Sequence, residues 1–352
     1  MSLSENLRDE MFSVTKKVAE NLKIEASKLQ PWIDAHVPGA GAIKKIEQFK
    51  GGQSNPTYKI TTEGKDLVLR RKPPGKLLQS AHAVDREYKV ITALYETDVP
   101  VPKTYGLCED DEVAGTAFFV MDFLDGDLFW NPMIPSLSNK DRTEIYRNKN
   151  KTLALLHGVD YKKIGLEDYG KPGNYVARQV ARWSKQYRAS ETDDIEAMNN
   201  LIDWLPKNIP DDDETSIVHG DYRLDNMILK NNQVMGILDW ELSTLGHPIA
   251  DFSYHCLSWR TQEAFWDQAK LKELGVPSEK EYMDMYCENT GKDLSKNWEF
   301  YMAFNMFKIA GILQGILGRV RDGTASSKHA EDRGMMVYPL SEAAWNTIKE
   351  NF

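Results

Sequence analysis

The pattern of apolar and polar residues changes character near residue 124. Before this point, short runs such as DLVLRR (residues 66–71), which follows a turn at Glu63-Gly64, indicate strands, and only a few segments have helical spacing. Beyond it, apolar residues recur mainly at intervals of three and four, which predicts helices. We expect an α+β protein with a small β-rich lobe, residues 1–124, and a larger helical lobe, residues 125–352. The expected elements are two short helices within 3–37, strands between 46 and 71, a helix at 83–95, strands at 103–108 and 116–123, and helices at 139–157, 174–188, 195–205, 262–274, 278–289 and 298–320.

One stretch of the helical lobe breaks this rule. The sequence NMILKNNQVMGILDW (residues 226–240) predicts a tight hairpin whose strands, 226–230 and 234–238, are joined by two asparagines. Antiparallel pairing places Asn226 opposite Asp239, at the roughly 5 Å typical of cross-strand neighbours. Asp221, in SIVHGDYRLDN, lies on the loop that enters the same hairpin. Two carboxylates and a carboxamide suit Mg²⁺ held jointly with phosphates, whereas turn capping would explain one aspartate but not all three groups.

Composition narrows the class of protein. The chain has 352 residues, 41% hydrophobic and 28% charged, with a net charge of -9, so nothing favours nucleic acid as a partner. Its three scattered cysteines show no metal-ligand spacing and indicate a reducing compartment. The charged N-terminus MSLSENLRDEM lacks the apolar core of a signal peptide, and polar residues interrupt the apolar segment 300–317. We therefore expect a cytoplasmic protein with no membrane partner, and the sequence leaves its oligomeric state open.

The hairpin region resembles a known family. His219-Gly220-Asp221, Asn226 and Leu238-Asp239-Trp240 are similar to the catalytic and metal-binding segments of aminoglycoside phosphotransferases and choline kinases, which have a protein-kinase-like bilobal fold. The resemblance implies that Asp221 accepts the proton of a substrate hydroxyl, while Asn226 and Asp239 hold Mg²⁺ against the phosphates of ATP. It also implies that His219 braces the catalytic loop.

The resemblance assigns a nucleotide site to the small lobe. In GGQSNPTY (residues 51–58), glycines let backbone N–H groups approach phosphates and polar side chains add donors, although a plain hairpin turn explains the glycines equally well. Arg70, which ends a strand, takes the place of the phosphate-contacting lysine of kinases; Arg71 and Lys72 are adjacent candidates, and a solvated basic strand end is the alternative. Glu87 on the next helix is its implied ion-pair partner. The residues implied to bind the nucleotide are Gly51, Gly52, Ser54, Asn55, Arg70 and Glu87. Met121, Asp122 and Leu124 are implied to contact the adenine. An ordinary core strand would explain the sequence of this last segment equally well.

The spacing after Asp239 separates this chain from protein kinases. Only eleven residues (240–250) separate Asp239 from Asp251 in IADFSYH, so no long activation segment ending in Ala-Pro-Glu follows the metal-binding aspartate. Asp251 in this segment resembles the family's aspartate that braces the catalytic loop, although a simple helix-start charge is an alternative. We therefore expect a small-molecule substrate.

Several longer stretches resemble one subfamily, the kinase-like domains fused to certain acyl-CoA dehydrogenases. They are FKGGQSNPTY, VLRRKPPGKLLQSAHAVDREY, VARQVARWSKQYRASE, VHGDYRLDN and LDWELSTLGHPIAD. This resemblance implies phosphorylation of hydroxy acids or their thioesters. The alternatives are an aminoglycoside or choline-type kinase and, in another class, a nucleotide-binding pseudokinase that acts as an interaction module.

The segment YVARQVARWSKQYR (residues 175–188) bears on the acceptor. Its apolar residues Val176, Val180, Trp183 and Tyr187 have helical spacing and should face the core. Arg178, Arg182 and Lys185 then form an adjacent basic stripe, which is either a solvated face or part of a site for an anionic acceptor held by Arg178 or Arg182.

Overall fold

The structure is a computed structural model that describes residues 15–50, 55–75, 83–262, 265–325, 327 and 329–352. The chain forms two compact units. Unit 1 comprises Met1–Leu155, Val159–Tyr169 and Arg223–Ser243, and unit 2 comprises Leu156–Gly158, Gly170–Tyr222 and Thr244–Phe352. The lobe boundary near residue 124 stays a prediction.

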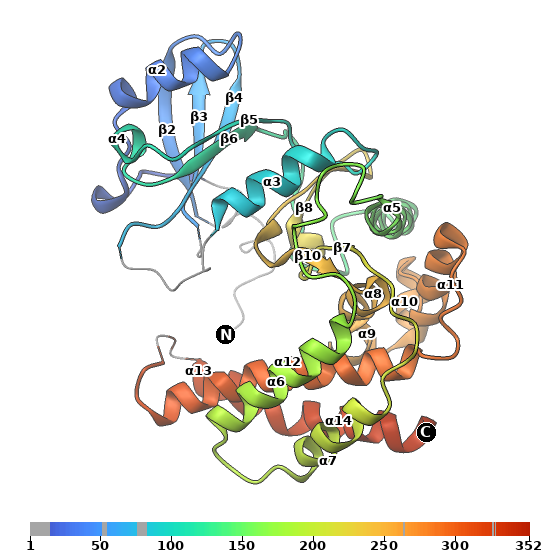
Figure 1. Cartoon of the computed structure of the whole chain (residues 1–352). Helices are drawn as coiled ribbons and strands as arrows, with labels where there is room; N and C mark the ends of the chain where they lie inside the picture. Colours follow the sequence, from blue (N-terminus) through green and yellow to red (C-terminus); the bar gives the residue numbers. More distant parts are fainter. Residues whose placement is uncertain (1–14, 51–54, 76–82, 263–264, 326, 328) are drawn as a thin grey trace. The chain divides into compact units, whose positions relative to one another are not determined.

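Unit 1 is built on a six-stranded antiparallel sheet with the order β1-β2-β3-β4-β6-β5 (Figure 1). Three helices accompany the sheet: α2 (Ala26–His36), α3 (Val84–Leu94) and the short α4 (Asp111–Ala114), and a 3-10 turn, Glu20–Leu22, precedes them. Of the two short helices predicted within 3–37, the described residues contain only α2 as an α-helix. The strands are β1 (Thr15–Lys16), β2 (Ile43–Phe49), β3 (Thr57–Thr62), β4 (Asp66–Arg71), β5 (Thr104–Cys108) and β6 (Phe118–Asp122).

Strand β4 shows how the sequence distributes residues between the two faces of this sheet. Leu67 and Leu69 are buried in a core cluster with Leu29 and Ile33 of α2. Because successive side chains of a strand point to opposite faces, Arg70 points away from this cluster. The alternation of side chains along β4 therefore decides on which side of the sheet each of its residues lies.

The predicted hairpin lies in unit 1. Strands β8 (Met227–Lys230) and β9 (Gln233–Ile237) pair through a turn in which Asn231 and Asn232 both have positive φ, 51° and 63°. Such a turn matches the twist of the strands and favours asparagine. Two 3-10 turns flank the hairpin, Leu224–Asn226 before it and Trp240–Leu242 after it, and the long helix α5 (Asn139–Gly158) runs from unit 1 into unit 2.

Unit 2 is mainly helical. The apolar helix α12 packs against α6, α8, α13 and α14, as the lower part of Figure 1 shows for α6 and α14. Among the described residues, α12 is the one helix long and apolar enough to cross a membrane, but 67% of its most apolar window is buried inside the structure, as expected of a core helix. The elements are α6 (Tyr175–Ser190), α7 (Glu196–Trp204), β7 (Ser216–Val218), β10 (Thr244–Gly246), α8 (Pro248–Cys256), α9 (Ser258–Thr261), α10 (Gln268–Leu274), α11 (Glu279–Thr290), α12 (Trp298–Arg321), α13 (Ala330–Met335) and α14 (Val337–Asn351), with a 3-10 turn at Leu205–Lys207.

Three features of unit 2 differ from the sequence prediction. Strands β7 and β10 form a second antiparallel pair, so the hairpin is not the single exception to the helical pattern. Each of these strands has three residues, too few for a two-residue period to stand out. Helices α13 and α14 were not predicted, and the helix predicted at 262–274 begins at Gln268, where the side chain of Asp267 caps the helix by accepting from the N–H of Lys270.

Candidate active site

The loop that carries Asp221 leaves strand β7 in unit 2 and is held by Asp251. Oδ2 of Asp251 accepts the backbone N–H of His219 at 2.8 Å, and Oδ1 accepts that of Gly220 at 2.9 Å. Gly220 has a φ of 83°, a conformation that glycine adopts without strain. Asp251 lies in the first turn of α8, and its position beside the loop fixes the two peptide groups that precede Asp221.

The buried carboxylate of Asp251 has a further partner, the side chain of His157. The Nε2 atom of His157 lies 3.2 Å from Oδ2 of Asp251, and Nδ1 of the same ring lies 2.7 Å from the phenol oxygen of Tyr286. Burial by itself would raise the pKa of Asp251, but the hydrogen bond and charge of His157, with the charge and N–H of His219, hold that pKa below its usual range. Asp251 is thus an ionised acceptor, so the Nε2 atom of His157 carries the proton of their hydrogen bond.

Asp221 itself is half-buried. Its backbone N–H donates to Nδ1 of His219 at 3.2 Å, and the His219 side chain is fully buried. His219 therefore makes the loop-bracing contact that the family resemblance implies. The roles of Asp221 and His219 in catalysis stay predictions.

In unit 1 the hairpin brings Asn226 and Asp239 to the same end. The N–H of Leu238 donates to the carbonyl oxygen of Asn226 at 2.8 Å, which makes Asp239 the next residue beyond the paired strands. Asp239 has a φ of 60°, and its side chain is 44% exposed. The cross-strand pairing expected from the sequence is present, offset by one residue.

A cluster of charges surrounds Arg70 in unit 1. Its Nε lies 2.6 Å from Oε2 of Glu87 on α3, and its Nη2 lies 2.7 Å from Oδ1 of Asp239. The expected ion pair of Arg70 with Glu87 is thus present. Arg71 points to the other face of the sheet, where it donates to the carbonyl oxygen of Leu22 and to the hydroxyl of Tyr58. The strand alternation therefore directs Arg70, rather than Arg71, toward the acidic residues.

Three carboxylates meet beside Arg70. Oxygen atoms of Glu87, Asp239 and Glu241 lie within 4.8 Å of one another, a donor set of the kind that divalent cations such as Mg²⁺ prefer. Burial, opposed by the charge and hydrogen bond of Arg70 and assisted by the nearby charges of Asp239 and Glu241, raises the pKa of Glu87 to about 7. The sequence did not single out Glu241, although it stands two residues after Asp239 in LDWE.

The predicted nucleotide residues of the loop 51–58 are only partly described. Gly51, Gly52 and Ser54 lie outside the described residues. Asn55 is fully buried, and its Nδ2 donates to Oε1 of Glu87 at 3.0 Å, so that Asn55 orients the carboxylate that binds Arg70. Direct contact of Asn55 with a nucleotide stays a prediction.

The residues predicted to contact adenine are Met121, Asp122 and Leu124, at the end of strand β6 and just beyond it. Met121 is buried, and the side chain of Asp122 accepts from the hydroxyl of Tyr105 at 2.6 Å. The N–H of Asp122 donates to the carbonyl oxygen of Lys103. Within the described part of the chain, the N–H of Leu124 donates no hydrogen bond. A free backbone donor at this position is what the predicted adenine contact of Leu124 requires.

Helix α6 has the face predicted from its sequence, with Val176, Val180, Trp183 and Tyr187 buried. Its two candidate arginines differ. Arg178 donates to the carbonyl oxygens of Gly173 and Lys171, so its guanidinium is used to hold the loop before the helix. Arg182 is exposed, and its guanidinium stacks on the ring of its neighbour Trp183. These contacts do not test whether Arg178 or Arg182 binds an anionic acceptor.

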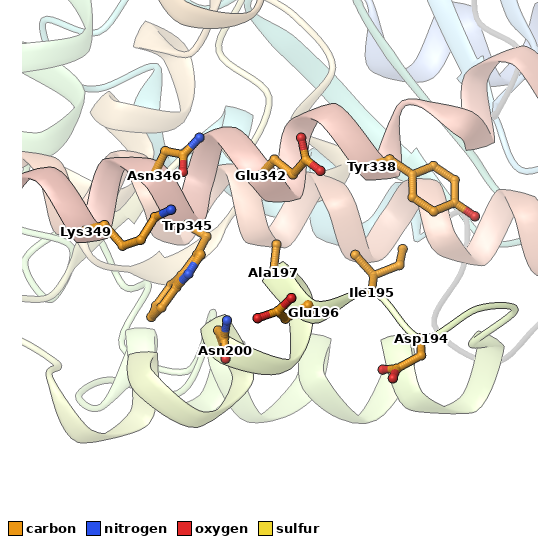
Figure 2. A pocket seen from close by; sticks show the side chains of 10 residues that line it. All are labelled: Asp194, Ile195, Glu196, Ala197, Asn200, Tyr338, Glu342, Trp345, Asn346 and Lys349. Carbon is orange, nitrogen blue, oxygen red and sulfur yellow. The ribbon is translucent and has the colours of Figure 1, made fainter.

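A hollow of about 480 Å³ lies between α7 and α14, and none of the predicted site residues lines it. Figure 2 shows that carboxylates and the indole of Trp345 line it, together with Lys349. The carboxylates are those of Asp194, Glu196 and Glu342. Three of the four charged side chains that line it are therefore acidic.

Comparison with known proteins agrees with this geometry. A family model described as the phosphotransferase enzyme family matches residues 45–286. The chain is 44% identical over 348 residues to acyl-CoA dehydrogenase family member 10 of Mus musculus, and the match covers 96% of this chain and 32% of that protein. The chain therefore spans about a third of the length of this relative.

Solved structures give the same result. A crystal structure from Ralstonia eutropha, provisionally named an aminoglycoside phosphotransferase, has a TM-score of 0.86 and 48% identity, covering 94% of this chain and 100% of that chain. A mutant of aminoglycoside phosphotransferase APH(4)-Ia, in a ternary complex with ADP and hygromycin B, has a TM-score of 0.61 at 11% identity, covering 91% and 98%, and shows the fold alone.

The chain belongs to the phosphotransferase enzyme family, whose members are small-molecule phosphotransferases. The fold class predicted from the sequence, a protein-kinase-like α+β fold with an N-terminal antiparallel sheet and a larger helical part, is confirmed. The resemblance to the kinase-like part of acyl-CoA dehydrogenase family members is confirmed as well.

Proposed function

We propose that this protein transfers the γ-phosphoryl group of Mg²⁺-ATP to a hydroxyl group of an anionic small molecule, such as a hydroxy acid or its thioester. The observation that carries the proposal is the cluster in unit 1 where Arg70 pairs with both Glu87 and Asp239. A buried glutamate orients the arginine, and the arginine reaches a half-exposed aspartate at the end of the hairpin. Basic and acidic groups in this arrangement suit a nucleoside triphosphate and its metal ion.

In this proposal the residues of unit 1 hold the nucleotide. Arg70 binds the α- and β-phosphates, and the N–H of Leu124 donates to adenine. Asn226 and Asp239, joined by Glu241, hold Mg²⁺, which neutralises charge on the transferred phosphoryl group when it is bound. Use of a nucleotide is supported by the fold neighbour that is described as a complex with ADP.

The residues of unit 2 act on the acceptor. Asp221 accepts the proton of the attacking hydroxyl, and Asp251 keeps the loop in one conformation through the N–H groups of His219 and Gly220. Because the peptide before Asp221 is fixed, the carboxylate loses little conformational entropy when the hydroxyl arrives. The cytoplasm remains our proposed location for this reaction.

The two alternatives differ in what they require. A choline- or aminoglycoside-type kinase needs acidic groups for a cationic acceptor, whereas α6 carries the exposed cations Arg182 and Lys185. A pseudokinase has no chemical need for Asp221, Asn226 and Asp239 together, and the chain retains all three.

The test is a screen for acceptor-dependent consumption of ATP. Hydroxy acids, hydroxyacyl thioesters, choline and aminoglycosides are supplied separately with ATP and Mg²⁺, and the product is identified by mass spectrometry. We expect phosphorylation of an anionic acceptor that disappears in the Asp221→Asn variant. Turnover of choline or an aminoglycoside alone would refute the anionic acceptor, and tight ATP binding without phosphorylation of any acceptor would support the pseudokinase.

A further inference from the structure

A lysine on the core helix α12 lies in an unusual environment. Lys308 is only half-exposed, and its Nζ atom lies 4.4 Å from the centre of the Tyr254 ring. In the part of the chain that the structure describes, no carboxylate lies within ion-pair distance of this ammonium. Removing an ammonium from water without a carboxylate partner is costly, and a cation–π contact compensates only in part. The chain contains 53 acidic residues, so a lack of available partners does not explain the arrangement.

The contacts within unit 2 place Lys308 beside the catalytic loop. Tyr254 and Asp251 are three residues apart on α8, so they lie on the same face of that helix. Asp251 in turn binds the N–H groups of His219 and Gly220, next to Asp221. Lys308 therefore packs on the helix face that fixes the loop, one contact removed from the proposed proton acceptor.

Helix α6 brings a second cation to the same place. It packs on α12 where Gly311 faces Trp183, and a Cβ atom at Gly311 would lie 3.6 Å from the indole ring. Lys308 is one turn before Gly311, and Arg182 is the neighbour of Trp183. Burial lowers the pKa of Lys308, the charges of Asp251 and Asp221 oppose this, and the charge of Arg182 lowers the pKa further. These four charges are thus close enough to interact.

Among the described residues, Lys308 still lacks a direct anionic partner. Asp251 does not supply it, because its carboxylate oxygens accept two backbone N–H groups and contact Nε2 of His157. An anion bound beside Lys308 and Arg182 would give the half-buried ammonium such a partner and offset part of its desolvation cost, whereas a cationic ligand would not.

We propose that Lys308, together with Arg182, binds the anionic group of the acceptor and so positions its hydroxyl at Asp221. This proposal rests on the proposed function and deepens it by naming a residue that selects the acceptor. The ligand chemistry is that of carboxylate or phosphate oxygens, supplied either by a free hydroxy acid or by the phosphates of a thioester's coenzyme A.

A direct test reads out binding without phosphoryl transfer. The amine of Lys308, with its lowered pKa, should react in reductive methylation, and mass spectrometry follows the modification of this one residue. The probes are 2-, 3- and 4-hydroxypentanoate, their amides and their coenzyme A thioesters. We expect an acid or a thioester to protect Lys308 while the matching amide does not. Protection by no probe, or equal protection by an amide, overturns the proposal.

A kinetic test uses Lys308→Met, with Lys272→Met, an exposed lysine of α10, as the matched control. The first variant should raise the KM of the anionic acceptor by about tenfold to a hundredfold, as expected for loss of a charge-assisted contact, and leave the ATP KM unchanged. Lys308→Arg should restore part of the affinity, and Lys272→Met should behave as wild type. A fall in kcat at unchanged acceptor KM would mean that Lys308 only tunes Asp221, and would overturn the proposal.

The two tests separate this proposal from the proposed function. Protection of Lys308 without phosphorylation of any acceptor would support the anion site and refute the kinase reaction. Phosphorylation of an acceptor with unaltered kinetics in Lys308→Met would support the kinase reaction and refute the role of Lys308. Whether the acid or the thioester protects and is phosphorylated identifies the source of the anion.

Discussion

Replacement of Asp251 by asparagine tests whether the catalytic loop depends on one buried carboxylate. The variant keeps the shape of the side chain but exchanges an acceptor oxygen for an NH₂ donor. In either orientation of the amide, at least one of the donors of His219, Gly220 and His157 then faces a donor and loses its partner. A buried donor without a partner costs about 1–3 kcal/mol, and the remaining hydrogen bonds lose the assistance of the charge. We expect a total loss of about 2–4 kcal/mol in the free energy of unfolding.

The assay is urea unfolding at neutral pH, read by circular dichroism, combined with measurement of kcat. The matched control is Asp110→Asn, because Asp110 is an exposed N-cap of α4 that accepts one N–H from Glu112 at 3.0 Å. Asparagine is an equally good N-cap, so the control should change stability by only a few tenths of a kcal/mol, about the scatter of the method. Wild-type stability in Asp251→Asn, or lost stability with wild-type kcat, would refute the view that Asp251 braces the loop.

The pH dependence of this stability difference has a definite sign. The folded pKa of Asp251 lies below its unfolded value of about 4, so the ionised carboxylate stabilises the fold wherever the unfolded group is also ionised. The advantage of wild type over Asp251→Asn should stay constant from neutral pH to about pH 5 and shrink as the pH falls below about 4. A difference that grows in acid would contradict the depressed pKa.

Four further substitutions test the remaining assignments. Asp221→Asn should lower kcat by about 10²–10⁴ while ATP affinity stays the same, which pre-steady-state kinetics and calorimetry can check; unchanged turnover would exclude Asp221 as the proton acceptor. Asp239→Ala should abolish the effect of Mg²⁺ on ATP affinity, and a persisting effect in calorimetry would place the metal elsewhere. Arg70→Met should weaken ATP binding by about tenfold or more, whereas Arg71→Met should mainly lower the unfolding midpoint, because Arg71 bonds to Leu22 and Tyr58. The reverse pattern would assign the phosphate contact to Arg71.

The sequence by itself determined the fold class, the hairpin and most of the helices, because these depend on local periodicity. Two adjacent asparagines between apolar runs specify a tight turn, and the apolar spacing of 175–188 specifies the buried face of α6. The motif around Asp221 identified the family, because recognition of a motif requires only the identity and spacing of its residues. The sequence missed strands β7 and β10, since three residues are too few to show a period.

Only the tertiary structure decided which polar side chains meet. Arg70 and Arg71 are chemically identical in the sequence, and the strand's alternation against α2 and α3 assigns them to different faces. Arg178 and Arg182 look equivalent on a helical wheel, yet carbonyl oxygens of the preceding loop occupy one and leave the other exposed. In the sequence, Lys308 only interrupts an apolar helical segment. The packing of α12 against α8 and α6 brings this lysine near Asp221. Such pairings join residues far apart in the chain, and no local pattern encodes them.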